Sequence, residues 1–117
     1  SRWPAGTRMK RGDIVTVAAP GDYGKPRPAV VILADELIED HASICFCQFT
    51  TTLNEKADYR VTIEPSAENG LHTRSQLMAD KPLTVARHRI GSVIGHLSET
   101  DLQRLNVALA FALGLPG

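Results

Sequence analysis

The chain has 117 residues, of which 43% are hydrophobic, and its formal net charge at pH 7 is zero. This length suits one domain with its own core, and no apolar run approaches the roughly 20 residues that a membrane-spanning helix needs. A secretory signal is not expected, because the N-terminus lacks an apolar segment, so we expect a cytoplasmic protein. A neutral chain also argues against broad nucleic-acid binding, and any RNA-binding surface must be a local basic patch.

The first eight residues have no periodic pattern and precede Met9. We interpret residues 1–8 as a disordered N-terminal extension or a remnant of cloning, and residues 9–117 as a single domain.

Short apolar stretches bounded by turn residues run through most of this domain. They predict strands at residues 14–19, 29–33, 43–50, 59–63, 75–79, 83–85 and 91–96. The acidic segment 35–40 is expected to connect two of them. No helix is predicted between the strands, which is typical of a small antiparallel barrel or a strongly curved sheet.

One helix is predicted, at the C-terminus. Ser98 is its expected N-cap, with Asp101 at the third helical position in a capping-box arrangement. Leu97 and Leu102 have the spacing of a hydrophobic staple. An apolar stripe follows at helical spacing, formed by Leu102, Leu105, Leu109 and Leu113. Gly114 ends the helix, which we interpret as a structural cover for the sheet.

Cysteines and histidines do not form a metal site in the sequence. Cys45 and Cys47 point to the same face of a predicted strand. Two ligands are at most half of a zinc site. We therefore interpret them as two buried thiols. The four histidines have no metal-ligand spacing. We therefore expect neither a metal nor another cofactor.

The segment from Pro20 to Pro28 is the best candidate for chemistry. Pro26 and Pro28 restrict the backbone on both sides of Arg27. A positioned guanidinium suits a site where negative charge develops in a reaction. Taken alone, the residues leave open the alternative that Arg27 is an edge-strand arginine in a surface salt bridge.

Four segments carry a resemblance to a known family. They are Lys10–Val15, Gly24–Ile32, Ser75–Lys81 and Ile90–Leu97. In their order and spacing they resemble the MazF/PemK family of bacterial toxins, and the resemblance extends from Met9 to Leu115. It implies an SH3-like antiparallel barrel with a C-terminal helix, of the CcdB/PemK type, that works as a homodimer in the bacterial cytoplasm.

The resemblance also implies an activity. Members of the family cut single-stranded RNA, usually mRNA, at short sequence motifs without a metal, and a partner antitoxin silences them by occupying the RNA groove. The family's active-site arginine falls on Arg27, and its threonine falls on Thr50, with Thr51 as the one-residue alternative. The aspartate of the PemK branch falls on Asp80. The arginine that this branch places two residues earlier is Met78 here, which favours the arrangement of arginine and threonine.

The implied reaction is attack by a ribose 2′-hydroxyl on the adjacent phosphate, giving a 2′,3′-cyclic phosphate and a 5′-hydroxyl end. Arg27 would stabilise the charge that builds up on the phosphate, and Thr50 would add a neutral hydrogen bond. Asp80 is a candidate general base, although its carboxylate is equally suited to capping a turn before Pro82.

Four further residues are candidates for RNA binding besides Thr51. Tyr23 and Lys25 are suited to stacking a base and holding a phosphate, or they form a solvated loop tip. Ser75 and Gln76 carry groups that read base edges, or they are ordinary residues at the start of a strand. Two rival functions remain at this point, namely a CcdB-like toxin that poisons DNA gyrase and a non-catalytic SH3-like binding module. The Lys-Pro-Arg-Pro motif with Thr50 favours the nuclease.

Overall fold

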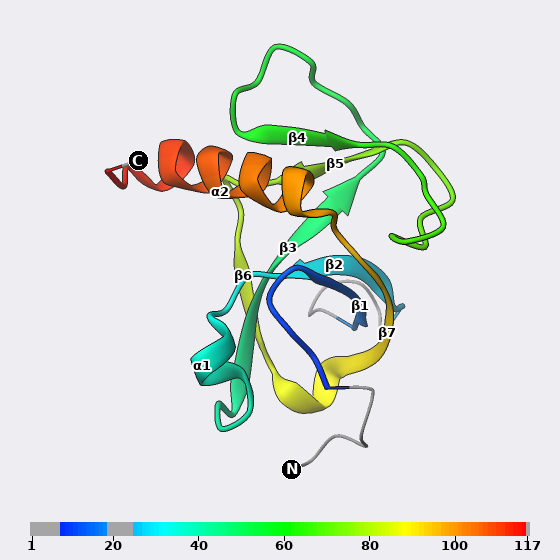
Figure 1. Ribbon diagram of the computed structural model, residues 1–117, viewed down its shortest axis with the longest axis vertical. Coiled ribbons are helices and arrows are strands. Elements are labelled where there is room, and N and C mark those ends of the chain that lie inside the picture. Colours follow the sequence, from blue (N-terminus) through cyan, green and yellow to red (C-terminus); the bar gives the residue numbers. More distant parts are fainter. Residues whose placement is uncertain (1–7, 19–24, 117) are drawn as a thin grey trace.

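A strongly bent antiparallel sheet with a helix against it makes up the fold of the computed structural model, which describes residues 8–18 and 25–116 (Figure 1). The strands are β1 (Asp13–Val17), β2 (Arg27–Val31), β3 (Ser43–Thr50), β4 (Arg60–Ile63), β5 (Ser75–Met78), β6 (Leu83–Ala86) and β7 (Ile90–His96). The helical elements are α1 (Asp35–Ile38), a 3-10 turn (Arg87–Arg89) and α2 (Glu99–Leu113). The predicted mainly-β architecture with a terminal helix is confirmed.

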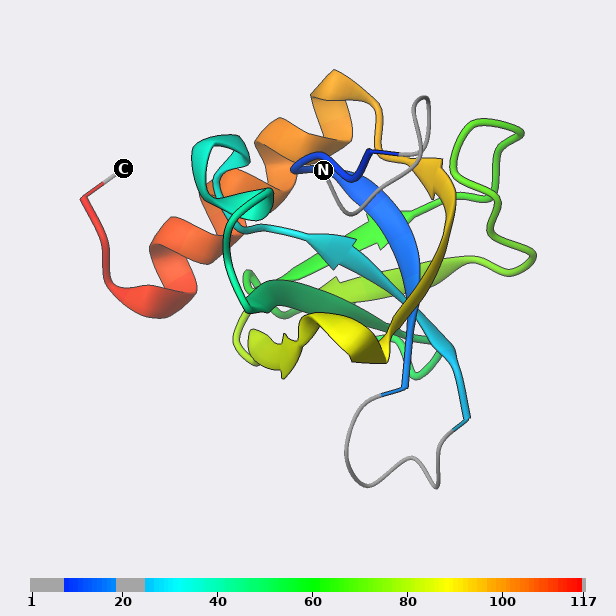
Figure 2. The ribbon, with the colours of Figure 1, turned by 90° about the horizontal axis from the view of Figure 1, so that it is seen from below.

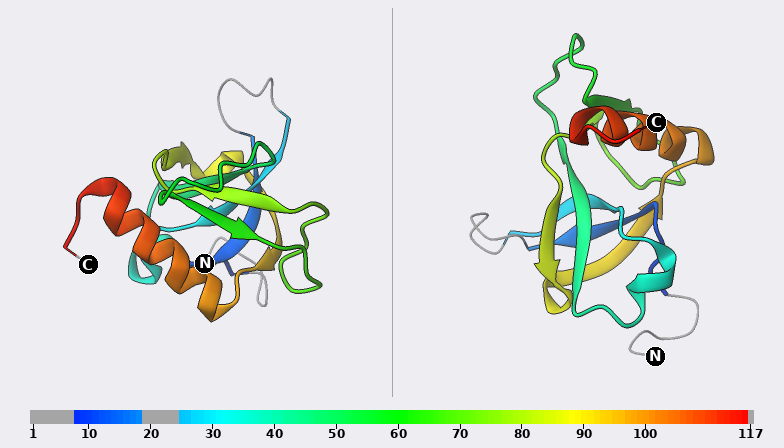
Figure 3. Two further views of the ribbon diagram at one scale, coloured as in Figure 1. Left: turned by 90° about the horizontal axis from the view of Figure 1, so that it is seen from above. Right: turned by 90° about the vertical axis from the view of Figure 1, so that its left-hand side faces the viewer.

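Strand β3 is the centre of the sheet. The strand order is β4-β5-β3-β2-β1-β7, and β6 also pairs with β3. One edge of β3 pairs with β2, while the other pairs with β6 along its first half and with β5 at its end. Figure 3 shows β6 running beside β3 in the right-hand view. The sheet therefore curls in two directions from β3 and forms an open, barrel-like shape.

Two apolar clusters occupy the two sides of this curled sheet. The first lies between the sheet and α2, and the second lies among β1, β2, β3, β6 and β7. Figure 2 shows α2 on one side of the bent sheet. Because successive side chains in a strand point to opposite faces, Val30 belongs to the first cluster, whereas its neighbours Ala29 and Val31 belong to the second. The continuous apolar run that predicted a buried strand is thus explained by burial on both faces.

Helix α2 confirms the predicted cap and stop signals. The Ser98 side chain accepts a hydrogen bond from the Asp101 N–H at 3.1 Å, and Gly114 adopts φ 70°, the left-handed conformation that glycine adopts without steric cost. Leu105 and Leu109 are buried, but Leu113, the last residue of the predicted stripe, is exposed. No helix among the described residues is long and apolar enough to cross a membrane.

Two local features differ from the prediction. The segment expected only to connect strands contains the one-turn helix α1, whose Ile38 is buried in the second cluster and whose acidic first-turn residues favour the positive end of a helix. Strand β2 begins at Arg27, two residues earlier than expected, because Arg27 and Pro28 already pair with Val17 and Thr16 of β1.

Asp13 is a carboxylate in a buried position at the start of β1, with 7% of its surface exposed. Its Oδ2 accepts a hydrogen bond from the Lys10 N–H at 2.9 Å. Burial raises the pKa of Asp13 above its ordinary value, and this effect outweighs the favourable hydrogen bond and the positive charge of Lys10. The raised pKa means that the ionised form of Asp13 destabilises the folded state relative to the protonated form.

We expect Asp13→Asn to raise the free energy of unfolding more at pH 7 than at pH 4. The amide retains an oxygen for the Lys10 N–H but does not ionise, so it avoids the loss of stability that the native carboxyl suffers as pH rises through its folded-state pKa. Urea unfolding at both pH values measures this difference. The exposed Asp40→Asn is the control. An equal effect of Asp13→Asn at both pH values would contradict the prediction.

Candidate active site at the end of strand β3

Arg27 and Thr50 lie at neighbouring strand ends. Strand β2 pairs with β3 through Ala29 and Gln48, and continuing this register by two residues places Arg27 opposite Thr50. Both side chains belong to the same face of the sheet, because they are each two residues from that pair. The ladder between β2 and β3 ends at Ala29 and Gln48, before it reaches Arg27 and Thr50. The fold therefore brings the two predicted residues to one edge of the molecule.

The two side chains differ in exposure and in their present contacts. Arg27 is exposed, and Thr50 is half-buried. The Thr50 Oγ1 accepts a hydrogen bond from the Thr52 N–H at 3.1 Å. A hydroxyl that accepts one hydrogen bond can still donate its own hydrogen. Thr50 is therefore oriented by its own loop and keeps a donor for a ligand.

A cleft of about 520 Å³ opens at the same strand ends, lined by chain neighbours of Arg27 and Thr50 and not by these two residues themselves. Pro28, next to Arg27, and Thr51, next to Thr50, both line it. Its other walls come from the loop before β5, from Ser75 and from Ile94 of β7. The cleft mixes apolar side chains with hydroxyls, and its volume falls in the range of small-ligand sites.

The wall formed by the loop between β4 and β5 is held firmly by Asn69, which is almost fully buried. Its Oδ1 accepts hydrogen bonds from the N–H groups of Ser66 and Leu71, at 2.9 and 3.0 Å, and its Nδ2 donates to the Glu64 carbonyl at 2.8 Å. The loop packs against β7, where the His96 N–H donates to the Glu68 carbonyl at 2.9 Å.

Gly95 makes this packing possible. A Cβ at Gly95 would lie 2.5 Å from the Asn69 carbonyl carbon and from the Glu68 carbonyl oxygen. Because both are backbone atoms, they cannot move aside without displacing the loop. The glycine therefore allows the close contact between the loop and β7.

Gln76 and Arg60 hold the opposite wall. Gln76 is 1% exposed, and its Oε1 accepts hydrogen bonds from the Asn54 N–H at 2.9 Å and from the Arg60 guanidinium at 3.3 Å. Its Nε2 donates to the Thr62 hydroxyl at 3.1 Å. Arg60 also donates to the Thr52 carbonyl at 3.1 Å. This network fastens the segment that follows Thr50 to β4 and β5.

The predicted RNA-contacting residues thus occupy different positions. Ser75 lines the cleft, although its hydroxyl donates to the Thr73 carbonyl at 2.9 Å. Gln76 lies beneath the surface with both polar groups engaged, so its geometry favours a positioning role over direct contact. Lys25 is exposed two residues before Arg27, and Tyr23 lies outside the described residues. Arg60 is a residue of this site that the sequence analysis did not single out, because nothing in the alternation of its strand marks it.

Asp80 is separated from the cleft. It is exposed in the turn between β5 and β6, whereas Ser75, at the other end of β5, lines the cleft. The three residue steps from Ser75 to Met78 span about 10 Å of strand. Asp80 does not line the cleft, and its catalytic role stays a prediction.

The two cysteines have no nucleophilic role in this arrangement. Both are free, Cys47 is buried and Cys45 is half-buried. Burial, with a smaller contribution from Cys45, raises the pKa of Cys47 to about 12, so its thiol stays protonated near neutral pH. The described residues contain no group of three or more histidine, cysteine or acidic side chains placed to hold a metal ion.

Gly95→Ala tests the packing of the cleft wall. We expect it to lower the free energy of unfolding by roughly 2 kcal/mol or more, because the new methyl group meets backbone atoms and the loop must shift. Chemical unfolding measures the loss. Ser92→Ala, at an exposed position on the same strand, is the matched control and should change stability by less than about 0.5 kcal/mol. Equal stability of the two variants would be inconsistent with the close contact.

Gln76→Ala tests the second wall. The change removes the acceptor for the Asn54 N–H and should cost about 1–3 kcal/mol of stability. Amide hydrogen exchange should become faster at Asn54, while exchange in α2 should change only as much as the loss of global stability requires. Gln103→Ala, on the exposed face of α2, is the control. Unchanged exchange at Asn54 would rule out Gln76 as the anchor of this segment.

Comparisons with known proteins identify the family of the chain. A family model described as PemK-like, MazF-like toxin of type II toxin-antitoxin system matches residues 10–113. The chain is 44% identical over 110 residues to a probable endoribonuclease MazF of Mycolicibacterium smegmatis. The aligned region covers 93% of this chain and 100% of that protein.

Solved structures share the fold. An endoribonuclease in complex with its cognate antitoxin, from a mycobacterial species, superposes with a TM-score of 0.80 at 24% identity, covering 94% of this chain and 99% of that one. A MazE–MazF complex from Deinococcus radiodurans gives a TM-score of 0.74 at 19% identity, covering 92% and 97%. From the family match and the identity to its curated relative, the chain belongs to the PemK-like, MazF-like toxins of type II toxin–antitoxin systems.

Proposed function

We propose that this protein is an endoribonuclease toxin that cuts single-stranded RNA, chiefly mRNA, without a metal ion. Its family and its 44% identity to a probable endoribonuclease support this proposal. The observation that carries it to particular residues is the placement of Arg27 and Thr50 at neighbouring strand ends beside a cleft. The same family match favours this activity over a gyrase-poisoning toxin and over a binding module.

In the reaction, the 2′-oxygen of a ribose attacks the adjacent phosphorus and the bond to the 5′-oxygen breaks. The products are a 2′,3′-cyclic phosphate and a 5′-hydroxyl end. Negative charge builds up on the phosphate oxygens in the transition state, where Arg27 donates charged hydrogen bonds and Thr50 donates a neutral one. A positioned donor of this kind typically contributes a factor of about 10²–10³ to the rate.

Single-stranded RNA fits the cleft better than a duplex does. A single strand can turn a base outward into a pocket, whereas a duplex presents stacked bases and phosphates. Thr51 and Ser75 place hydroxyls near such a base, and Lys25 lies close enough in the chain to Arg27 to hold a second phosphate. Because the whole chain is neutral, binding depends on these local charges.

We further propose that the protein works as a homodimer in the bacterial cytoplasm, where mRNA is found. A cognate antitoxin would inhibit it by covering the cleft and Arg27. Structural relatives described as toxin–antitoxin complexes support this partner class.

Replacement of Arg27 by alanine tests the assignment. With single-stranded RNA in EDTA, wild-type protein should cut and leave cyclic-phosphate ends, whereas Arg27→Ala should be slower by a factor of at least about 10²–10³. Because Arg27 is exposed, both proteins should be folded, as circular dichroism and unfolding curves would show. Thr50→Val should lose less, since the hydrogen bond it removes is uncharged.

Arg8→Ala removes the same charge from an exposed arginine that pairs with Glu39, on another part of the surface, and should cut at the wild-type rate. Wild-type cleavage by Arg27→Ala would refute the role of Arg27. Cleavage by the wild-type protein that required a divalent metal would refute the metal-independent reaction.

A further inference from the structure

One proton transfer in the proposed reaction has no residue assigned to it. The 2′-hydroxyl must lose its proton as it attacks, and a group that accepts it must lie within hydrogen-bond reach of that oxygen. Asp80, the carboxylate that the sequence offers, does not line the cleft. We therefore consider the residues that line the cleft as candidates for this base.

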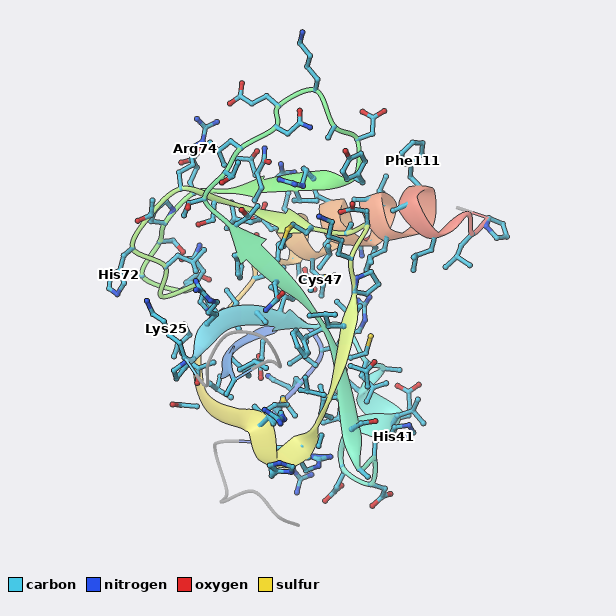
Figure 4. All side chains as sticks on the ribbon, turned by 180° about the vertical axis from the view of Figure 1, so that it is seen from behind. Lys25, His41, Cys47, His72, Arg74 and Phe111 are labelled. Carbon is cyan, nitrogen blue, oxygen red and sulfur yellow. The ribbon has the colours of Figure 1, made fainter. Side chains whose placement is uncertain are left out.

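Among the described residues that line the cleft, His72 alone carries an imidazole, the side chain that enzymes use most often for proton transfer. The other lining residues are proline, threonine, glycine, leucine, serine and isoleucine. His72 shares the cleft with Pro28 and Thr51, the chain neighbours of Arg27 and Thr50. In Figure 4, His72 and Lys25 lie at the same edge of the molecule, whereas His41 lies at its far end.

The loop that carries His72 has contacts on both sides of this residue. On one side Gly70 adopts φ +68° and packs closely on β7, since a Cβ there would lie 2.5 Å from the Ile94 carbonyl oxygen. On the other side the exposed Arg74 guanidinium pairs with Glu64 at 2.9 Å and with Glu55 at 3.5 Å. His72 itself is exposed and lines the cleft, so a substrate in the cleft has access to it.

We propose that His72 is the general base of the RNA cleavage reaction, an inference that rests on the function proposed above. The neutral imidazole takes the proton from the 2′-hydroxyl while the bond from O2′ to phosphorus forms. The bond from phosphorus to O5′ breaks, and the departing oxygen takes a proton from water.

Charged groups around His72 largely offset one another. Arg74 follows it closely in the chain, but Glu55 and Glu64 pair with that guanidinium. Lys25, just before β2, and Arg27, the first residue of β2, are further cations in the chain segment that leads to Pro28 at the cleft.

The test is single-turnover cleavage in EDTA between pH 5 and pH 8.5. The substrate is a short RNA containing a cut site that was first mapped on a long mixed-sequence RNA. The wild-type rate should rise with pH through the range in which imidazole titrates and then level off. His72→Gln should be slower by about 10²–10⁴ and lose this rise. Its RNA affinity and its unfolding curve should match those of the wild type. His41→Gln is the matched control and should behave as the wild type.

Two additional measurements separate a base from other roles. Added imidazole should restore part of the rate to His72→Ala. An RNA whose leaving 5′-oxygen is replaced by sulfur needs no proton on departure, so it should not rescue His72→Gln. Full rescue by sulfur would assign His72 as the acid and overturn the proposal. Weaker RNA binding with an unchanged pH profile would likewise overturn it in favour of a base-stacking role.

The outcomes for the two proposals are distinct. If the wild type cleaves, Arg27→Ala does not and His72→Gln keeps the wild-type rate and pH profile, the His72 inference fails and the proposed function stands. If the wild type cleaves no RNA, both fail.

Discussion

The division of β3 between three partners is the constraint on which the rest of the structure depends. Its edge toward β2 sets the register at Ala29 and Gln48, and Arg27 itself pairs with Val17 of β1. Its other edge changes partner from β6 to β5 near its end. Thr50 therefore lies where β3 has left its ladder with β2 but still pairs with Gln76 of β5. The change of partners in β3 thus determines both the bend of the sheet and the place of Thr50.

An opening in a sheet must be supported, since unpaired backbone groups are costly to leave without partners. Here side chains supply the support on both walls. Gln76 and Arg60 bind the segment after Thr50, and Asn69 binds the loop that carries His72. Each wall rests on a buried amide side chain that satisfies several groups at once. A buried amide serves this purpose because it donates and accepts without carrying a charge that would need compensation.

The amino-acid sequence predicts the elements better than it predicts the contacts. The cap at Ser98, the alternation in β3 and the turn residues around β2 are local signals, and the strands and α2 form where those signals indicate. Arg27 is marked locally by its flanking prolines, whereas Thr50 is identified only through the resemblance to a family. Gln76 shows what local sequence patterns do not predict. A glutamine near the start of a strand has the same pattern whether its side chain faces solvent or makes buried hydrogen bonds, as it does here. Its burial depends on the fold of residues 52–54 over it, which is a tertiary effect.

Met78 shows how the site differs from the PemK pattern that the sequence resembles. That pattern places an arginine at this position, yet Met78 is half-buried and pairs directly with Arg60 across β4 and β5. Residues directly opposite in an antiparallel ladder share a face, so a guanidinium still stands on this face, one strand further out. The Arg60 guanidinium donates hydrogen bonds to the Thr52 carbonyl and to Gln76, so it supports the segment that follows Thr50. The guanidinium on this face therefore has a supporting role, and Arg27, at the start of β2, is the arginine proposed to act on the phosphate.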